Sequence, residues 1–303
     1  MAGCFTSFYL LEVQLETGER IADLLHPEWG NLRLFQGDPP ETAQPDGGVL
    51  TGTLFTATGP SSHPVGFSLG TTRMWGIGLL PLGWARFMDV PASEMADTVS
   101  DGLHHPAFAH FVPLLDQLAA APADDEAQAA MIGAFFRAID RPVRAERQIA
   151  AIHEALIDPA LHSASDLARR AGISQRSLER LCARYFGFGP RLLIRRQRMM
   201  RTLATYMLSP DATWTQTIDL QYADHAHFTH EFHAFMGMCP SEYAERDHPV
   251  LRTFMAERAR VLGSPVQTLD PPRTKGWPRA LIPALGGSLL RCTATLDQIA
   301  GFV

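Results

Sequence analysis

A six-residue motif occurs twice in the second half of the chain at an offset of 50 residues, as YFGFGP at 185–190 and FMGMCP at 235–240. The match extends backwards, since the apolar position Leu178 falls on Phe228. Each copy predicts a helix with one buried stripe, a glycine after it, and a proline that starts the next helix. The repeat therefore restricts this region to two similar helical units.

The first copy, SASDLARRAGISQRSLERLCARYFG (163–187), has the local features of a helix-turn-helix unit. Ser163 predicts the cap of a first helix, and Ser174 predicts the cap of a second. Between them, Ala168 is small enough for the two helices to cross closely, and Gly172 can adopt the left-handed conformation of a turn. The segment therefore predicts two helices joined by a turn.

The second helix of this unit carries polar side chains on the face opposite its apolar stripe. In a helix-turn-helix protein the N-terminal half of that helix enters the major groove of DNA. Arg176 and Arg180 are one turn apart, and arginine can make paired hydrogen bonds to guanine edges, so we expect these two to read bases. The alternative is a solvated basic helix face. The predicted DNA-binding positions are Gln175, Arg176, Ser177, Glu179, Arg180 and Arg184.

Charge is distributed unevenly along the chain, whose formal net charge is −6. Residues 1–162 hold 8 basic and 20 acidic side chains, whereas residues 163–201 hold 10 arginines and two acids. The acidic total therefore does not exclude DNA, because the cations are concentrated in the first unit and in the helix that follows. That connecting helix is predicted to begin at Pro190, and the side chains expected to contact phosphate are Arg191, Arg195, Arg196 and Arg198.

The second unit departs from the first in its turn and in its charge. Gln221 occupies the position that Gly172 fills in the first unit, and Thr217 occupies that of Ala168. A residue other than glycine at positive φ costs on the order of 1 kcal/mol, so we expect strain here. The outer face offers histidines, which are mostly neutral at pH 7, so the first unit should dominate affinity. The positions predicted to face DNA are His225, His227 and His230.

This arrangement resembles the AraC/XylS family of transcription regulators, whose DNA-binding domain is two helix-turn-helix units joined by one long helix. The resemblance covers about residues 145–248 and is carried by LARRAGISQRSLERL and ADHAHFTHEFHAFMGMCPSEY. It implies a regulator that reads adjacent major grooves, with Arg176, Glu179 and Arg180 at base-reading positions of the first unit and the three histidines at those of the second. Candidate partners are double-stranded DNA, RNA polymerase, an unknown small-molecule effector and a second copy of the chain.

The first hundred residues predict a compact antiparallel β domain, because short apolar runs such as LRLF (32–35) alternate with turn segments such as GPSSHP (59–64). This part looks similar to the β-rich sensor domains of one branch of the same family, which implies an effector-binding or oligomerising role. The fold class is therefore α+β multidomain, with a β-rich N-terminal domain followed by an all-α domain that contains two helix-turn-helix units joined by a long helix. The expected segments are a β-rich domain at 1–118, a linker and helix at 119–141, a double helix-turn-helix domain at 142–260 and an unassigned tail at 261–303.

Other classes of protein find less support in the sequence. No apolar run reaches the roughly 18 residues of a membrane span, and the start of the chain lacks the basic region of a signal peptide, so we expect a cytoplasmic protein. The four cysteines form no CxxC pair, and no acid or cysteine completes a close metal set with the histidines. We therefore predict no metal, cofactor or catalytic residue.

Two alternatives stay open. The chain could be a protein-interaction module with degenerate DNA binding, because the second unit departs from the expected pattern. It could also be a DNA-binding half fused to a catalytic N-terminal domain, although no GxSxG or HExxH motif is present. A gel shift with random-sequence and genomic DNA distinguishes the first alternative from a DNA-binding regulator.

Overall fold

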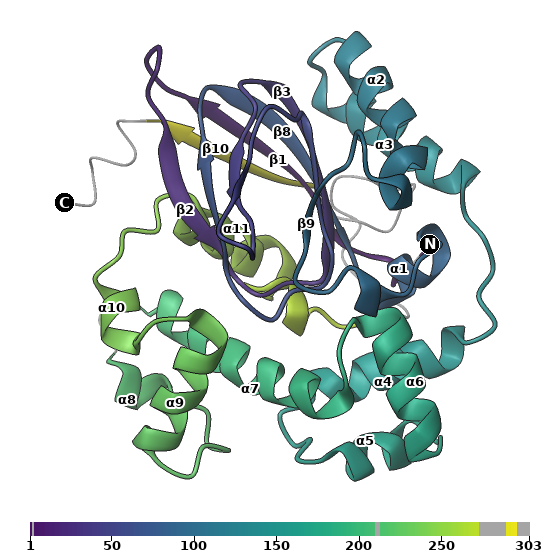
Figure 1. The fold of residues 1–303 in the computed structure, drawn as a ribbon, viewed down its shortest axis with the longest axis vertical. Coiled ribbons are helices and arrows are strands. Elements are labelled where there is room, and N and C mark those ends of the chain that lie inside the picture. Colours follow the sequence, from purple (N-terminus) through teal and green to yellow (C-terminus); the bar gives the residue numbers. More distant parts are fainter. Residues whose placement is uncertain (2, 210–212, 273–288, 296–303) are drawn as a thin grey trace.

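The computed structural model describes residues 1, 3–209, 213–272 and 289–295, the last segment as backbone only. A β-rich body lies on one side of the molecule, a group of helices lies below it, and helix α7 (Pro190–Met207) runs between the two ends of that group (Figure 1). The strands are β1 (Phe5–Gln14), β2 (Ile21–Leu25), β3 (Gly30–Gly37), β4 (Glu41–Ala43), β5 (Val49–Leu50), β6 (Phe55–Thr58), β7 (Val65–Leu69), β8 (Thr72–Leu79), β9 (Val99–Asp101) and β10 (Leu289–Thr295).

The strands form two sheets, one of six strands in the order β10-β1-β8-β3-β6-β9 and one of four in the order β2-β7-β4-β5. Pairs within residues 5–101 are antiparallel, so the predicted antiparallel β domain is confirmed. Strand β10 differs, because it follows the whole helical region and pairs in parallel with β1. Part of the tail that the sequence leaves unassigned therefore belongs to the N-terminal sheet.

The helical region predicted after the β domain is also confirmed. Helix α1 begins directly after β8 at Pro81, since proline is well suited to the first position of a helix. The helices are α1 (Pro81–Phe87), α2 (Val112–Ala120), α3 (Asp125–Ala138), α4 (Glu146–Ile157), α5 (Ala164–Arg170), α6 (Gln175–Phe186), α7, α8 (Trp214–Thr217), α9 (His225–Met236), α10 (Pro240–Ala244) and α11 (Leu251–Leu262), with 3₁₀ turns η1 (Ala92–Glu94), η2 (Pro106–Phe111) and η3 (Gln267–Leu269).

Helix α3 occupies most of the segment expected to link the two halves. Asp124 starts this helix, since its Oδ1 accepts hydrogen bonds at 3.0 Å from the backbone N–H groups of Glu126 and Ala127. Ile132 and Phe136 on α3 are completely buried. The helix is therefore part of the core, and only residues 121–124 separate it from α2.

One hydrophobic core is shared by the β-rich body and the first helical unit. Phe5 of β1 lies in the same buried cluster as Leu178 and Phe186 of α6. Trp29, between β2 and β3, packs edge-to-face on Phe186 with ring centroids 5.7 Å apart, and on His153 of α4 at 5.8 Å. The first unit is therefore not an independent domain attached by a linker.

Helix α11 also packs on the β-rich body, although the sequence places it inside the expected DNA-binding domain. Asp23 of β2 is completely enclosed, and its Oδ2 accepts hydrogen bonds from the backbone N–H groups of Val250 at 3.0 Å and Leu251 at 2.8 Å. Phe254 packs edge-to-face on Tyr9 of β1, with ring centroids 4.8 Å apart.

Among the residues that the structure describes, no helix has both the length and the apolar character needed to cross a membrane.

Candidate nucleic-acid interface

The first helix-turn-helix unit consists of α5, a turn and α6. Ser163 Oγ accepts a hydrogen bond from the Asp166 N–H at 3.1 Å, and Ser174 Oγ accepts one from the Ser177 N–H at 3.2 Å. Gly172 has a φ of 66°, in the left-handed region that glycine enters without strain. The two caps and the glycine turn predicted from the sequence are therefore present.

The predicted DNA-facing positions of α6 lie together on one side of the helix, opposite the buried Leu178 and Leu181. Arg176 and Arg180 have no hydrogen bond or ion pair to another group in the described part of the chain. Their guanidinium groups are therefore available to an external acceptor. The exposed members of the set are Gln175, Arg176, Glu179, Arg180 and Arg184, and Ser177 is half-buried.

Helix α7 places its predicted phosphate contacts in different environments. Arg191 is exposed, whereas Arg196 is completely buried. Arg196 Nη1 donates to the Ser61 carbonyl at 2.8 Å, and its guanidinium carbon lies 4.0 Å from the centroid of the Trp29 ring. Burial lowers the pKa of Arg196 to about 9, so the group is still charged at pH 7. The prediction that Arg196 contacts phosphate is wrong for this conformation, because the side chain joins α7 to the β-rich body.

Arg195 and Arg198 are paired with an acid of the second unit. Glu231 of α9 is 2% exposed, and it accepts hydrogen bonds at 2.7 Å from Arg195 Nε and from Arg198 Nη2. Burial alone would raise the pKa of Glu231, but the arginine hydrogen bonds outweigh burial and hold that pKa below its usual range. These two arginines therefore reach phosphate only if they share or release this carboxylate.

Sequence reasoning missed Glu231, although the sequence contains a signal for it. Glu231 lies three residues after Phe228 and directly before Phe232, on the buried side of α9. A carboxylate at such a position requires a cationic partner, because an unpaired buried charge is costly. The arginine-rich helix α7 was the obvious source of that partner.

The second unit has a shorter first helix and a longer turn than the first. Helix α8 is four residues long, and Asp224 starts α9 by accepting a hydrogen bond from the His227 N–H at 2.7 Å. Among the described residues Asp97 is the one non-glycine residue with positive φ, so Gln221 does not adopt that conformation. The strain predicted at Gln221 is therefore absent, because the longer turn from 218 to 224 replaces the tight glycine turn.

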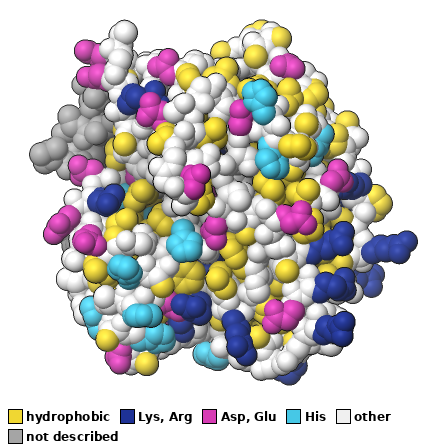
Figure 2. Space-filling model, viewed as in Figure 1, with side chains coloured by type: hydrophobic (Ala, Val, Ile, Leu, Met, Phe, Trp, Pro, Cys, Tyr) yellow, Lys and Arg dark blue, Asp and Glu magenta, His cyan; other side chains and the backbone are white. Residues whose placement is uncertain are grey.

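The three predicted histidines of the second unit all lie on α9. His225 and His230 are exposed, and His227 is half-buried. Figure 2 shows the resulting contrast, with arginines gathered at the lower right over the first unit and histidines at the lower left over the second. No set of three side chains suited to a metal ion occurs within the described ranges.

A cavity in the β-rich body is a second candidate site. Each of the two arginines in its wall is paired with a carboxylate, which balances its charge. Arg33 Nη2 lies 2.6 Å from Glu28 Oε1, and Arg258 Nη2 lies 2.6 Å from Asp270 Oδ2. The rest of the wall is mainly apolar and comes from both sheets and from α11. Lining residues include Tyr9, Leu11, Phe35, Phe67, Met74, Phe254 and Met255.

Comparison with known proteins identifies the helical region. Residues 167–246 match the family model for a helix-turn-helix domain. No curated protein matches the chain. The segment matched by the family model begins in α5 and ends after α10, so it contains both repeats.

Several solved structures are similar over most of the chain. ToxT from Vibrio cholerae O395 is 11% identical, with 78% of this chain and 95% of that chain covered and a TM-score of 0.41. Unsaturated fatty acid bound wild-type ToxT from Vibrio cholerae strain SCE256 is 11% identical, with 78% and 93% covered and a TM-score of 0.38. The AraC-like transcriptional activator CuxR is 18% identical, with 66% and 78% covered and a TM-score of 0.23.

Proposed function

We propose that this chain is a transcription regulator of the AraC type and not an enzyme, and that it binds double-stranded DNA at two adjacent major grooves. The match of residues 167–246 to a helix-turn-helix domain supports this proposal. Helix α6 enters one groove and α9 the next. The 18 residues of α7 span about 27 Å, close to the ~34 Å repeat of major-groove faces once helix offsets are added. The observation that carries this proposal is the exposed face of α6, where Arg176 and Arg180 have no hydrogen-bond or ion-pair partner among the residues that the structure describes.

The two units contribute unequally in this proposal. Helix α6 offers three exposed arginines, which stay charged at any pH near neutrality, whereas α9 offers His225, His227 and His230 and no arginine. Two arginines that lie between the units are already paired with Glu231. The first unit therefore supplies most of the affinity for DNA, and the second unit extends the contact to a second groove and adds selectivity for its sequence.

The cavity in the β-rich body is the proposed effector site. Its lining is mainly apolar and both of its arginines are paired with carboxylates, which favours an uncharged apolar molecule. Helix α11 forms one wall and follows the second helix-turn-helix unit in the chain. A ligand that moves α11 would therefore act on the DNA-binding region. RNA polymerase and a second copy of the chain stay predicted partners.

Alanine substitution of Arg176 and Arg180, one at a time, tests DNA recognition. The probes are duplexes that the full chain selects from a library with a random central region. Each substitution should weaken binding by about 1 to 3 kcal/mol and relax the preference at one or two base pairs. Arg252→Ala is the matched control, because Arg252 is also exposed but lies on α11.

Two outcomes would contradict this proposal. An unchanged binding profile for both single variants would remove these arginines from base recognition. Failure of the wild-type chain to enrich any sequence would favour the alternative of a protein-interaction module.

A further inference from the structure

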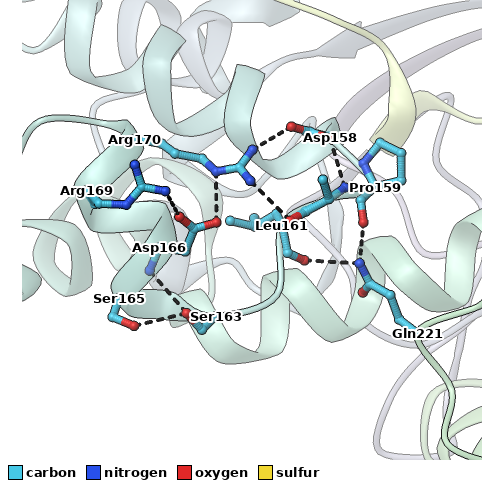
Figure 3. Close-up of polar contacts among 10 residues, drawn as sticks. Asp158, Pro159, Leu161, Ser163, Ser165, Asp166, Arg169, Arg170 and Gln221 are labelled. Atoms are coloured by element: carbon cyan, nitrogen blue, oxygen red, sulfur yellow. Dashed lines mark hydrogen bonds and ion pairs between the residues drawn. The ribbon is translucent and has the colours of Figure 1, made fainter.

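The two helix-turn-helix units are connected by more than helix α7. Gln221, in the turn between α8 and α9, reaches the loop that precedes α5 in the first unit (Figure 3). Its Nε2 donates hydrogen bonds to the backbone carbonyl oxygen of Pro159 and, at 3.3 Å, to that of Leu161. The equivalent position of the first unit is Gly172, which has no side chain. Within the described part of the chain, the hydrogen bonds from the second unit to this loop come from Gln221.

The loop that accepts these hydrogen bonds is itself fixed to the first unit. Arg170 of α5 donates from Nη1 to Asp158 Oδ2 at 2.5 Å and from Nη2 to the Ala160 carbonyl at 3.1 Å. Arg170 Nε also donates to Asp166 Oδ2 at 2.8 Å, which ties the loop to the start of α5. Figure 3 shows this network around Arg170 on one side of the loop and Gln221 on the other. The two carbonyl groups are therefore a rigid target.

The turn that carries Gln221 is fixed to α7. The Gln221 N–H donates to Asp219 Oδ1 at 2.9 Å, and Asp219 Oδ2 accepts from Arg201 Nε at 2.5 Å. The Asp219 N–H also donates to Thr202 Oγ1 at 2.9 Å. These contacts complete a closed circuit that runs from α7 through the second unit, across Gln221 to the first unit, and back to α7.

We infer that Gln221 is a positioning residue that sets the separation of the two recognition helices, and so the spacing of the two DNA half-sites that the chain accepts. The inference rests on the proposed function, in which both units bind DNA. A helix alone leaves its two ends free to bend and rotate, whereas a closed circuit fixes them. Gln221 belongs to neither hydrophobic cluster of the helical region and lines an open cleft between the units, so its loss should not unfold the protein.

The decisive variant is Gln221→Met, which keeps the length of the side chain and removes both donors. Leu220→Ala is the control, because Leu220 lies in the same turn with its side chain fully exposed. The first measurement needs no DNA. Spin labels on unnatural amino acids at positions 184 on α6 and 234 on α9 report the distribution of distances between the units in the full chain. That distribution should be narrow in the wild type and the control, and broad in Gln221→Met.

The second measurement selects duplexes from a random library with each of the three proteins. The wild type and the control should enrich two motifs at one dominant separation. Gln221→Met should enrich the same motifs with discrimination between separations reduced by about tenfold, because two hydrogen bonds are lost.

Three results would overturn the inference, and they are distinguishable. Identical distance distributions in all three proteins would show that Gln221 does not fix the units. Broader distances with an unchanged dominant separation would show that it does not set half-site spacing. A single enriched motif for the wild type would instead refute the binding of two grooves, whatever the distances show.

Discussion

Acidification should weaken the fold where the β-rich body meets the helical region, because two histidines are buried there in neutral form. His26 is 6% exposed, and its Nε2 lies 2.6 Å from the Tyr243 hydroxyl of α10. His153 is 1% exposed and packs against Trp29. Burial, aided by the nearby His248, lowers the pKa of His26 to about 3, and burial lowers the pKa of His153 to about 3.

The sign of the effect follows from proton uptake in the two states. The unfolded chain protonates these rings below about pH 6.5, whereas the folded chain does so only near pH 3, so the unfolded state binds more protons between these values. Stability therefore falls as the pH falls through this window. Between pH 7 and pH 5 each ring removes about 2 kcal/mol from the free energy of unfolding, and the two together remove about 4 kcal/mol.

Urea unfolding of the full chain at pH 7, 6 and 5, followed by circular dichroism, measures this loss. The double variant His26→Gln, His153→Gln should be less stable at pH 7 and should lose much less free energy between pH 7 and pH 5. His162→Gln is the control, because His162 is exposed and has no ion pair or hydrogen bond through its side chain within the described residues, and it should keep the wild-type dependence. Equal losses in the wild type and the double variant would refute the reasoning.

Three further predictions concern the DNA-binding region. Glu231→Gln should lower stability by about 3 kcal/mol because it leaves Arg198 without its buried counter-charge, and an unchanged melting temperature would contradict this. The isolated fragment 142–260 should fold poorly, because its first unit shares a core with the sheets; a stable fragment with specific DNA binding would show that this core is dispensable. DNA affinity should rise as the pH falls from about 8 to 6, because phosphate favours a charged imidazole, and replacement of the three α9 histidines by Gln should flatten that dependence. Matching pH profiles for the wild type and the triple variant would place these histidines away from DNA.

The local structure of the first unit was predictable because its determinants are local. Ser163, Gly172 and Ser174 act on their own neighbours within four residues, and the apolar stripe of α6 follows directly from its spacing. The same holds for the start of α3 at Asp124. Caps and turns depend on nearby residues, so a single sequence contains the information needed to place them.

Contacts between distant segments were not predictable in the same way. Arg196 is the same residue type, on the same helix, as the exposed Arg191 and Arg195. It is buried because it packs on Trp29, which lies more than 160 positions away in the sequence. The return of β10 to the sheet beside β1 has no periodic signal in the tail. The strain expected at Gln221 assumes that the second unit has the same turn as the first, whereas the second turn is longer and has a different geometry.

Hydroxyl-radical footprinting of the full chain on a selected duplex is the most direct test of the central claim that one chain reads two adjacent major grooves. If one chain reads two adjacent grooves, two protected windows are expected on the same face of the DNA, about one helical turn apart. The window that Arg176→Ala weakens should differ from the one weakened by replacement of the three α9 histidines. A single window that Arg176→Ala weakens and that replacement of the three α9 histidines leaves unchanged would contradict this claim. It would show that α9 does not contact the DNA.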